Sequence, residues 1–207
     1  MQLLANTTSP FVRIARIALI EKGLEIEPTL VDPWADDSRL RAANAATRVP
    51  ALVLDDGTAL TESLLIAQWL EATRPAPQWP SLLGADAQLV AGVLSRAGVA
   101  LGAIDAAVHT IITRKVTAPV LFDETPVGLR RRRTMVEGMQ RLEAAAGDMV
   151  ASAEAAPTLD VVCAVVLFDY QQLRFADQPW LPATPRLKAL AEAVPQRPSF
   201  GRTLPHV

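Results

Sequence analysis

Hydroxyl side chains gather in residues 7–9, directly before a helical pattern that begins at Pro10. Thr8 and Ser9 follow a short apolar run, residues 3–5, that is typical of a buried strand. In an α/β sheet, ligands bind where a strand leads into a helix, and the free N–H groups of the helix start stabilise a thiolate or a carboxylate there. The alternative is that Thr8 or Ser9 only caps the helix by accepting from its first N–H groups.

Two further segments that could bind a ligand flank a predicted β-hairpin. Val49-Pro50 precedes the hairpin. If this X-Pro bond is cis, the backbone N–H and C=O of Val49 turn outward and can pair with an extended peptide, whereas a trans proline would only protect the start of the strand. Glu62-Ser63 follows the hairpin and opens a helix. The Ser63 hydroxyl can donate to a carboxylate, and the Glu62 carboxylate can accept from an ammonium. The pair could therefore bind an amino-acid zwitterion, or it could be an ordinary helix start.

The elements that would position these segments follow the order β-α-β-α-β-β-α, which predicts a mixed sheet with helices on its faces. Gly23 ends the first helix, and Asp55-Asp56-Gly57 is the turn of the hairpin. The predicted elements are a strand at 3–5, a helix at 10–22, a strand at 24–30 interrupted or bounded by Pro28, a short exposed helix at 36–46, hairpin strands at 49–54 and 58–60, and a helix from 61 to 70.

The remainder of the chain has a different pattern. Residues 75–83 are rich in proline, which is typical of a linker. Helical spacing then predominates, over residues 85–115, 126–152, 158–175 and 184–194. We therefore expect an α/β domain at 1–74, a linker at 75–83 and an all-helical domain at 84–207.

Composition excludes several classes of protein. The 207 residues are 50% hydrophobic and 20% charged, which is typical of a globular chain, and the net charge of −2 gives no attraction for nucleic acid or an anionic membrane. The longest apolar run, Val161 to Phe168, has about eight residues, far fewer than the roughly 20 that span a bilayer. One cysteine and no visible signal peptide favour a reducing compartment. We expect a cytoplasmic protein that binds neither nucleic acid nor a membrane.

In their order and spacing, the serine before the first helix, the Val-Pro before the hairpin and the Glu-Ser after it resemble the N-terminal thioredoxin-like domain of the cytosolic glutathione S-transferases. The likeness continues through the proline-rich linker into the helical domain, and the tail at residues 197–203 is similar to the closing segment of many bacterial members. The resemblance implies an α/β thioredoxin-like domain followed by an all-α domain, a homodimer, glutathione as co-substrate and no metal.

The resemblance also implies roles for particular residues. Ser9 matches the serine that serine-type members use to activate the glutathione sulfur, and Thr8 is the second candidate for that role. The backbone of Val49, beside a cis Pro50, would pair with the cysteinyl part of glutathione. The other implied contacts are Glu62 and Ser63 at the γ-glutamyl end, Phe11, Arg48 where the glycyl end might reach, and His109 in the electrophile pocket that the helical domain completes.

These roles predict a glutathione transferase that stabilises the glutathione thiolate and presents it to a small hydrophobic electrophile. A glutathione-dependent isomerase or dehalogenase is a related alternative, because serine-type members include both. A glutathione-binding carrier or an adaptor of the same fold is an alternative outside catalysis. Since position 9 is not cysteine, this chain cannot form a mixed disulfide with glutathione there.

One helix start departs from the family pattern. Thr158 can cap the helix at 158–175, but the acid expected three residues later is displaced to Asp160, so the reciprocal capping box is lost. Cys163 lies in the apolar run of this helix and is predicted to be a buried, inert thiol. The four arginines at 130–133 spread around a helix and do not form a stripe for nucleic acid.

Overall fold

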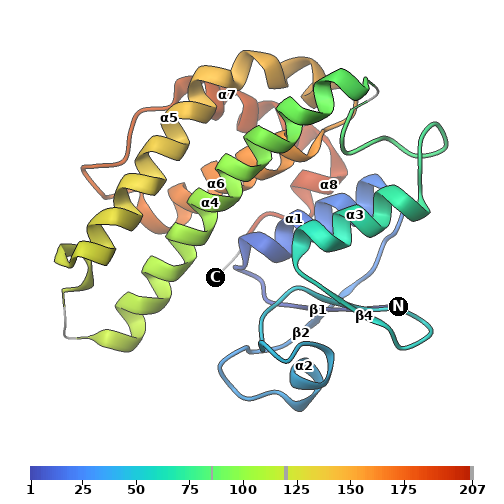
Figure 1. The fold of residues 1–207 in the computed structure, drawn as a ribbon, viewed down its shortest axis with the longest axis horizontal. Coiled ribbons are helices and arrows are strands. Elements are labelled where there is room, and N and C mark those ends of the chain that lie inside the picture. The colour runs from blue at the N-terminus through green and yellow to red at the C-terminus, as the bar shows by residue number, and fades with distance from the viewer. Residues whose placement is uncertain (85, 119–120, 206–207) are drawn as a thin grey trace. The chain divides into compact units, whose positions relative to one another are not determined.

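The computed structural model of the chain describes residues 1–84, 86–118 and 121–205. Contacts divide the chain into two compact units, Met1–Leu82 with the C-terminal segment that starts at Pro195, and Leu83–Val194. The first unit contains a sheet with helices on its faces, and the second unit is built of helices (Figure 1). The predicted fold class, an α/β thioredoxin-like domain followed by an all-α domain, is confirmed.

The sheet of the first unit has four strands in the order β2-β1-β3-β4. β1 is parallel to β2, and β3 is antiparallel to both β1 and β4. Helices α1 and α3 pack against each other on one face of the sheet, and α2 lies on the opposite face (Figure 1). The elements are β1 Gln2–Ala5, α1 Pro10–Glu21, β2 Pro28–Leu30, α2 Ser38–Ala43, β3 Ala51–Val53, β4 Ala59–Thr61 and α3 Ser63–Thr73, in the predicted order.

The second strand is shorter than predicted. Even spacing of apolar residues placed it at 24–30, but pairing with β1 begins only at Pro28, which lies opposite Leu3. Gly23 reverses the chain after α1 with a φ of 70°, and residues 24–27 return the chain to the sheet before pairing starts. A proline is tolerated at the first residue of an edge strand, because no ladder hydrogen bond to its nitrogen is needed there.

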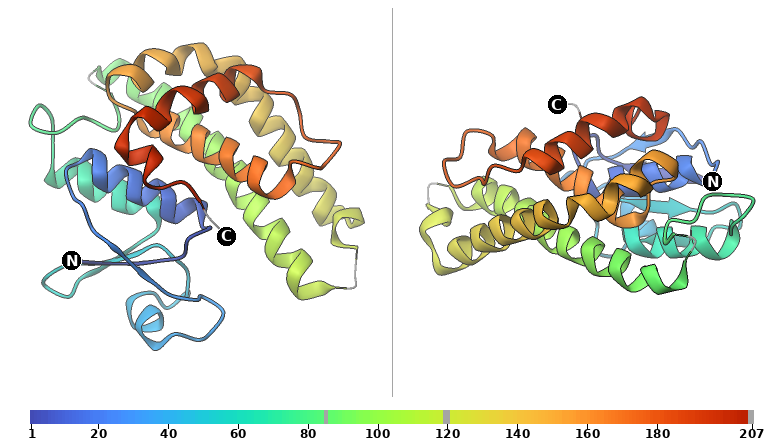
Figure 2. Two further views of the ribbon diagram at one scale, coloured as in Figure 1. Left: turned by 180° about the vertical axis from the view of Figure 1, so that it is seen from behind. Right: turned by 90° about the horizontal axis from the view of Figure 1, so that it is seen from above.

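The second unit is built around α6, which is buried along nearly all of its length from Leu159 to Leu167. Helix α4 packs along both α5 and α6, and α7 packs against α5 and α6 (Figure 2). The helices are α4 Ala87–Thr117, α5 Pro126–Ala155, α6 Leu159–Phe175 and α7 Pro185–Ala193, with a 3-10 turn at Phe122–Glu124. All four predicted helical segments are therefore helices.

One helix of the described residues, α4, is long and apolar enough by length and composition to cross a membrane. The longest uninterrupted apolar run in the sequence does not lie in α4, because polar residues interrupt the apolar stretches of this helix. The same length and composition occur in the core helix of a helical bundle. Helix α4 packs on both α5 and α6, and 28% of its apolar stretch is buried.

The C-terminal segment packs on the first unit, although the sequence placed it in the helical domain at 84–207. A short helix that the sequence did not predict, α8 Pro198–Gly201, contacts α1. The Glu21 side chain, 7% exposed, accepts from Arg197 Nε at 3.2 Å and Nη2 at 2.9 Å, and also from the Ser199 hydroxyl. A carboxylate near the end of α1 thus holds the segment in place.

Replacing Glu21 with alanine should lower the free energy of unfolding by about 2–4 kcal/mol, because Arg197 and Ser199 lose a nearly buried acceptor. Glu192→Ala is the matched control: Glu192 forms an exposed ion pair with Lys188 one turn away, 3.7 Å between charged atoms, and its loss should cost less than about 0.5 kcal/mol. Urea unfolding followed by circular dichroism measures both. Equal losses in the two variants would contradict the role of Glu21.

Candidate functional site

Three segments of the first unit meet at one edge of its sheet. Ala51, the first residue of β3, pairs with Leu4 of β1 on one side and with Thr61 of β4 on the other. The loop after β1, the residues before β3 and the residues after β4 therefore emerge together. Helices α1 and α3 both begin at this edge and run alongside each other (Figure 1). With strands about 4.8 Å apart, this edge spans roughly 10 Å from β1 to β4.

Ser9 and Thr8 lie in the loop after β1, and their hydroxyl groups are used differently. Ser9 is the N-cap of α1, and its Oγ accepts from the N–H of Val12 at 3.3 Å. The Thr8 hydroxyl donates to Asn6 Oδ1 at 2.9 Å, and the Thr8 N–H donates to the same oxygen. The Ser9 O–H has no acceptor among the described residues, so it can cap the helix and still donate to a ligand.

The peptide bond between Val49 and Pro50 is cis, as the resemblance implies. No partner for the backbone N–H or C=O of Val49 is found within the described parts of the chain. The loop before this bond is organised by buried Asn44, whose Nδ2 donates to the Arg48 carbonyl at 2.8 Å and whose Oδ1 accepts from the Ala46 N–H at 3.0 Å. Sequence reasoning missed Asn44, although an amide at the end of a helical pattern is a common turn-forming residue.

Glu62 and Ser63 form the start of α3. Glu62 has a φ of 65°, in the left-handed region that non-glycine residues rarely adopt and that is enriched at functional sites. No side chain caps this helix, and the buried Ser63 hydroxyl has no partner among the described residues. Glu62 Oε1 accepts from Arg48 Nη2 at 2.6 Å, so the segments before β3 and after β4 are in direct contact. The uncapped N–H groups of α3 suit an anion.

The other two predicted site residues, Phe11 and His109, lie in different units of the chain. Phe11 is half-buried in the first turn of α1, at the same edge as Ser9. His109 lies on α4 of the second unit, where its Nε2 is 3.3 Å from Asp105 Oδ1 and its side chain is 45% exposed. His109 is therefore a surface residue paired with Asp105. Its role in an electrophile pocket stays a prediction.

Helix α6 begins differently from the sequence expectation. Thr158 is its N-cap residue, but the Thr158 hydroxyl makes no capping bond and donates to Asp160 Oδ1 at 2.5 Å. The other oxygen of buried Asp160 accepts from Arg96 Nε at 2.7 Å. The expected Thr158 cap is thus wrong, because the hydroxyl donates its hydrogen bond to the early carboxylate of Asp160 and makes none with the helix N–H groups.

The arginines at 130–133 are dispersed around α5, as the helical spacing predicts. Arg130 and Arg133 are exposed, Arg131 lies 3.8 Å from Asp105, and Arg132 lies over the Trp180 ring. They therefore do not form a single basic stripe.

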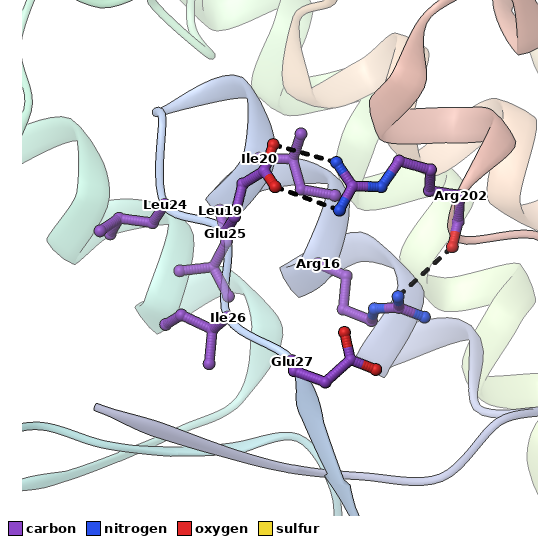
Figure 3. Close-up of a pocket in the computed structure, with 8 residues that line it drawn as sticks. All are labelled: Arg16, Leu19, Ile20, Leu24, Glu25, Ile26, Glu27 and Arg202. Carbon is purple, nitrogen blue, oxygen red and sulfur yellow. Dashed lines mark hydrogen bonds and ion pairs between the residues drawn. The ribbon is translucent and has the colours of Figure 1, made fainter.

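A cavity of about 140 Å³ lies elsewhere in the first unit, between α1, the segment after Gly23 and Arg202 (Figure 3). Arg202 donates to both oxygens of Glu25, at 3.0 and 3.1 Å, and Arg16 donates to the Arg202 carbonyl at 3.3 Å. None of the residues predicted to bind glutathione lines this cavity. Its charged groups hold the C-terminal segment against α1. No cluster of metal-ligating side chains occurs in the described part of the chain.

The fold of this chain is one that known proteins share. A thioredoxin-like unit with a mixed four-stranded sheet, followed by a helical unit, is the architecture of the glutathione S-transferases. Residues 8–73 match the family described as glutathione S-transferase, N-terminal domain. This match extends from the loop before α1 to the end of α3, and it includes every residue predicted to bind glutathione.

Known proteins are similar over the whole length of the chain. The uncharacterized GST-like protein YibF of Escherichia coli K12 is 29% identical over 207 residues, which cover 99% of this chain and 98% of YibF. A glutathione S-transferase from Methylobacterium radiotolerans, in complex with glutathione sulfonate, is 28% identical with a TM-score of 0.85 and covers 100% of this chain and 95% of its own. A glutathione transferase family member from Pseudomonas fluorescens Pf-5 with bound glutathione is 25% identical with a TM-score of 0.81, covering 100% and 99%.

The buried thiol yields a prediction. Burial raises the pKa of the Cys163 thiol well above its ordinary value, and the charge of Asp160 adds to this effect. Because the thiolate is the reactive form, Cys163 should not react with a thiol reagent in the folded protein at neutral or mildly alkaline pH, and should react at once in denaturant. Absorbance titration with a chromogenic disulfide measures both. Rapid labelling of the folded protein would contradict the prediction.

Proposed function

We propose that the protein is a glutathione transferase that binds glutathione along this edge of the first unit and stabilises its thiolate. The observation that carries the proposal is the strand register, which places Ser9, Val49 and the Glu62-Ser63 pair at one edge. Support comes from the family match of residues 8–73, and from the glutathione and glutathione sulfonate bound in the two similar structures.

Each end of the ligand has a partner of suitable chemistry. The γ-glutamyl carboxylate would accept from Ser63 and from the uncapped N–H groups of α3, while its ammonium would donate to Glu62. The cysteinyl backbone would pair with the backbone N–H and C=O of Val49, as a short added strand pairs with a sheet edge. The sulfur would then lie at the start of α1, near Ser9.

The sulfur can be ionised without a protein base. A thiol has a pKa of roughly 8.5, and lowering it by about two units requires about 2.7 kcal/mol in favour of the thiolate. A hydrogen bond from the Ser9 hydroxyl to the anion contributes about 1.5–3 kcal/mol, and the N-terminus of α1 contributes about 0.3–2 kcal/mol. Thr8 is the weaker candidate, because its hydroxyl proton already binds Asn6.

The thiol proton would leave to water, and the thiolate would form a C–S bond with a small hydrophobic electrophile while the leaving group departs with the electron pair of its broken bond. In this proposal Ser9 makes the protein a serine-type transferase, and no metal is needed for the step. A cytoplasmic location agrees with the use of glutathione as co-substrate. A carrier would bind glutathione equally well, but would not turn over an electrophile. A glutathione-dependent isomerase or dehalogenase would use the same thiolate on a different substrate.

We also propose that the protein is a homodimer that buries the exposed face of α3. Leu64 and Leu65 are 42% and 53% exposed at the start of this helix. Neighbouring exposed leucines on a helix next to a binding edge are typical of a surface that another protein covers. A second copy of the chain is the occupant that the family resemblance implies.

Ser9→Ala should raise the pKa of the bound glutathione thiol by about 1–2 units, because the thiolate loses its hydroxyl donor. The thiolate fraction at neutral pH should fall and return at higher pH. Ultraviolet absorbance of the bound thiolate against pH measures the change, and conjugation of a chlorodinitrobenzene electrophile should fall in parallel at neutral pH. Thermal unfolding of the variant checks that the loss of the cap leaves the protein folded.

Thr8→Val is the matched control, since it removes a hydroxyl and keeps the shape of the side chain. It should leave the pKa of the bound thiol unchanged. A raised pKa in Thr8→Val with none in Ser9→Ala would transfer the role to Thr8. Failure of the wild type to bind glutathione would disprove the proposed function, and a bound thiolate without turnover of any electrophile would indicate a carrier.

Leu65→Lys should convert the protein to a monomer, because the new charge would have to be buried without a partner in the proposed interface. Leu30→Lys is the control, since Leu30 is 59% exposed on the edge strand β2 and lies outside α3. Sedimentation velocity at micromolar protein concentration distinguishes the two. A monomeric wild type would show that the homodimer proposal is wrong.

A further inference from the structure

Arg48 forms an ion pair with another of the residues predicted to bind glutathione. The resemblance placed it near the glycyl end of glutathione, but its Nη2 donates to Glu62 Oε1 at 2.6 Å. Glu62 is the residue proposed to receive the γ-glutamyl ammonium, at the opposite end of the ligand. The structure therefore connects Arg48 to the residue that is proposed to bind the ammonium.

The backbones that carry both side chains are fixed by separate contacts. The Arg48 carbonyl accepts from Asn44 Nδ2 at 2.8 Å, which holds the residue that precedes Val49 and its cis bond. The Glu62 carbonyl accepts from the Ile66 N–H at 3.0 Å, in the first turn of α3, and Glu62 has a φ of 65°. The ion pair thus joins the loop before β3 to the residue that follows β4.

The contact uses only part of the Glu62 carboxylate. Arg48 binds Oε1, and Oε2 has no partner among the described residues. A carboxylate accepts about four hydrogen bonds, whereas an ammonium has three N–H groups to donate. One Glu62 side chain can therefore bind the guanidinium with one oxygen and a ligand ammonium with the other.

We infer that Arg48 is a positioning residue for the γ-glutamyl ammonium: it holds the Glu62 carboxylate in a single orientation, with one oxygen directed to the ligand. This inference rests on the proposed function. Without Arg48, the half-exposed Glu62 side chain would lose rotamer freedom each time it bound the ammonium. Exposed ion pairs contribute little to the free energy of unfolding, so removal of Arg48 should affect binding and leave the fold intact.

The test uses glutathione and two analogues that each lack one charged group. The first is glutaryl-cysteinylglycine, which has no α-ammonium, and the second is glutathione glycyl ethyl ester, which has no glycyl carboxylate. Isothermal titration calorimetry on the full chain gives Kd for each ligand, in the wild type and in Arg48→Gln. Arg41→Gln is the matched control, because Arg41 also forms an exposed ion pair in this unit, 2.9 Å from Asp36.

Arg48→Gln should weaken glutathione binding about 3–10-fold, the size expected for one well-placed polar contact. The same loss should appear with the glycyl ester, and a change below about 2-fold should appear with the des-amino analogue. Arg48→Lys should restore part of the affinity, and Arg41→Gln should have no effect. In a Glu62→Gln background, Arg48→Gln should cause no further loss, because the two residues act through one interaction.

Each other result overturns the inference. A loss that disappears with the glycyl ester and persists with the des-amino analogue would place Arg48 on the glycyl carboxylate. A loss of equal size with all three ligands would show that Arg48 only shapes the loop, and no loss would show that the ion pair has no role in binding. If the wild type binds no glutathione, the proposed function fails, and the role of Arg48 fails with it.

Discussion

Antiparallel pairing of β3 with both of its neighbours determines where the groups proposed to bind a ligand lie in the first unit. Ala51 pairs with Leu4 and with Thr61, so the chain leaves β1, enters β3 and leaves β4 at the same edge. A shift of either pairing by one residue would turn the buried side chains of these short strands to the opposite face. The apolar residues of the sheet, among them fully buried Leu52, therefore also fix the position of polar groups that do not belong to the core.

The two helices that start at this edge have different N-termini. Helix α1 is capped by Ser9, whose oxygen satisfies one N–H group while its proton stays available. Helix α3 has no side-chain cap, and the residue before it, Glu62, has a left-handed backbone conformation. The first arrangement suits a single atom that carries negative charge, and the second suits a carboxylate that accepts from several N–H groups. A γ-glutamyl thiol peptide carries both kinds of group.

Local signals predicted most of the elements. Pro10 and Gly23 mark the ends of α1, and the Asp-Gly turn marks the hairpin, because each of these residues restricts or permits particular backbone angles. The site residues could be predicted only together, because their order and spacing resemble those of a family. Each pair alone also fits an ordinary helix cap or turn. The strand predicted at 24–30 was too long, because apolar alternation does not show where pairing with β1 begins.

Contacts between residues far apart in the chain could not be predicted in this way. The sequence gives no sign that Arg48 pairs with Glu62 or that Asn44 holds the Arg48 carbonyl, because side-chain direction depends on the folded loop. The Thr158 cap could not be judged for a similar reason: Arg96, more than sixty residues earlier, binds the Asp160 carboxylate that accepts the hydrogen bond of the Thr158 hydroxyl.

The first unit is discontinuous in sequence, because the C-terminal segment binds Glu21 of α1 through Arg197 and Ser199. Its sheet is complete within the first 61 residues, but α8 is synthesised only after the whole of Leu83–Val194. On the ribosome, a chain is made from its N-terminus, and domains generally fold as they emerge. The sheet can therefore form early in synthesis, but the side of α1 that α8 contacts stays uncovered. It is covered only after the helical unit has left the exit tunnel and α8 has been synthesised.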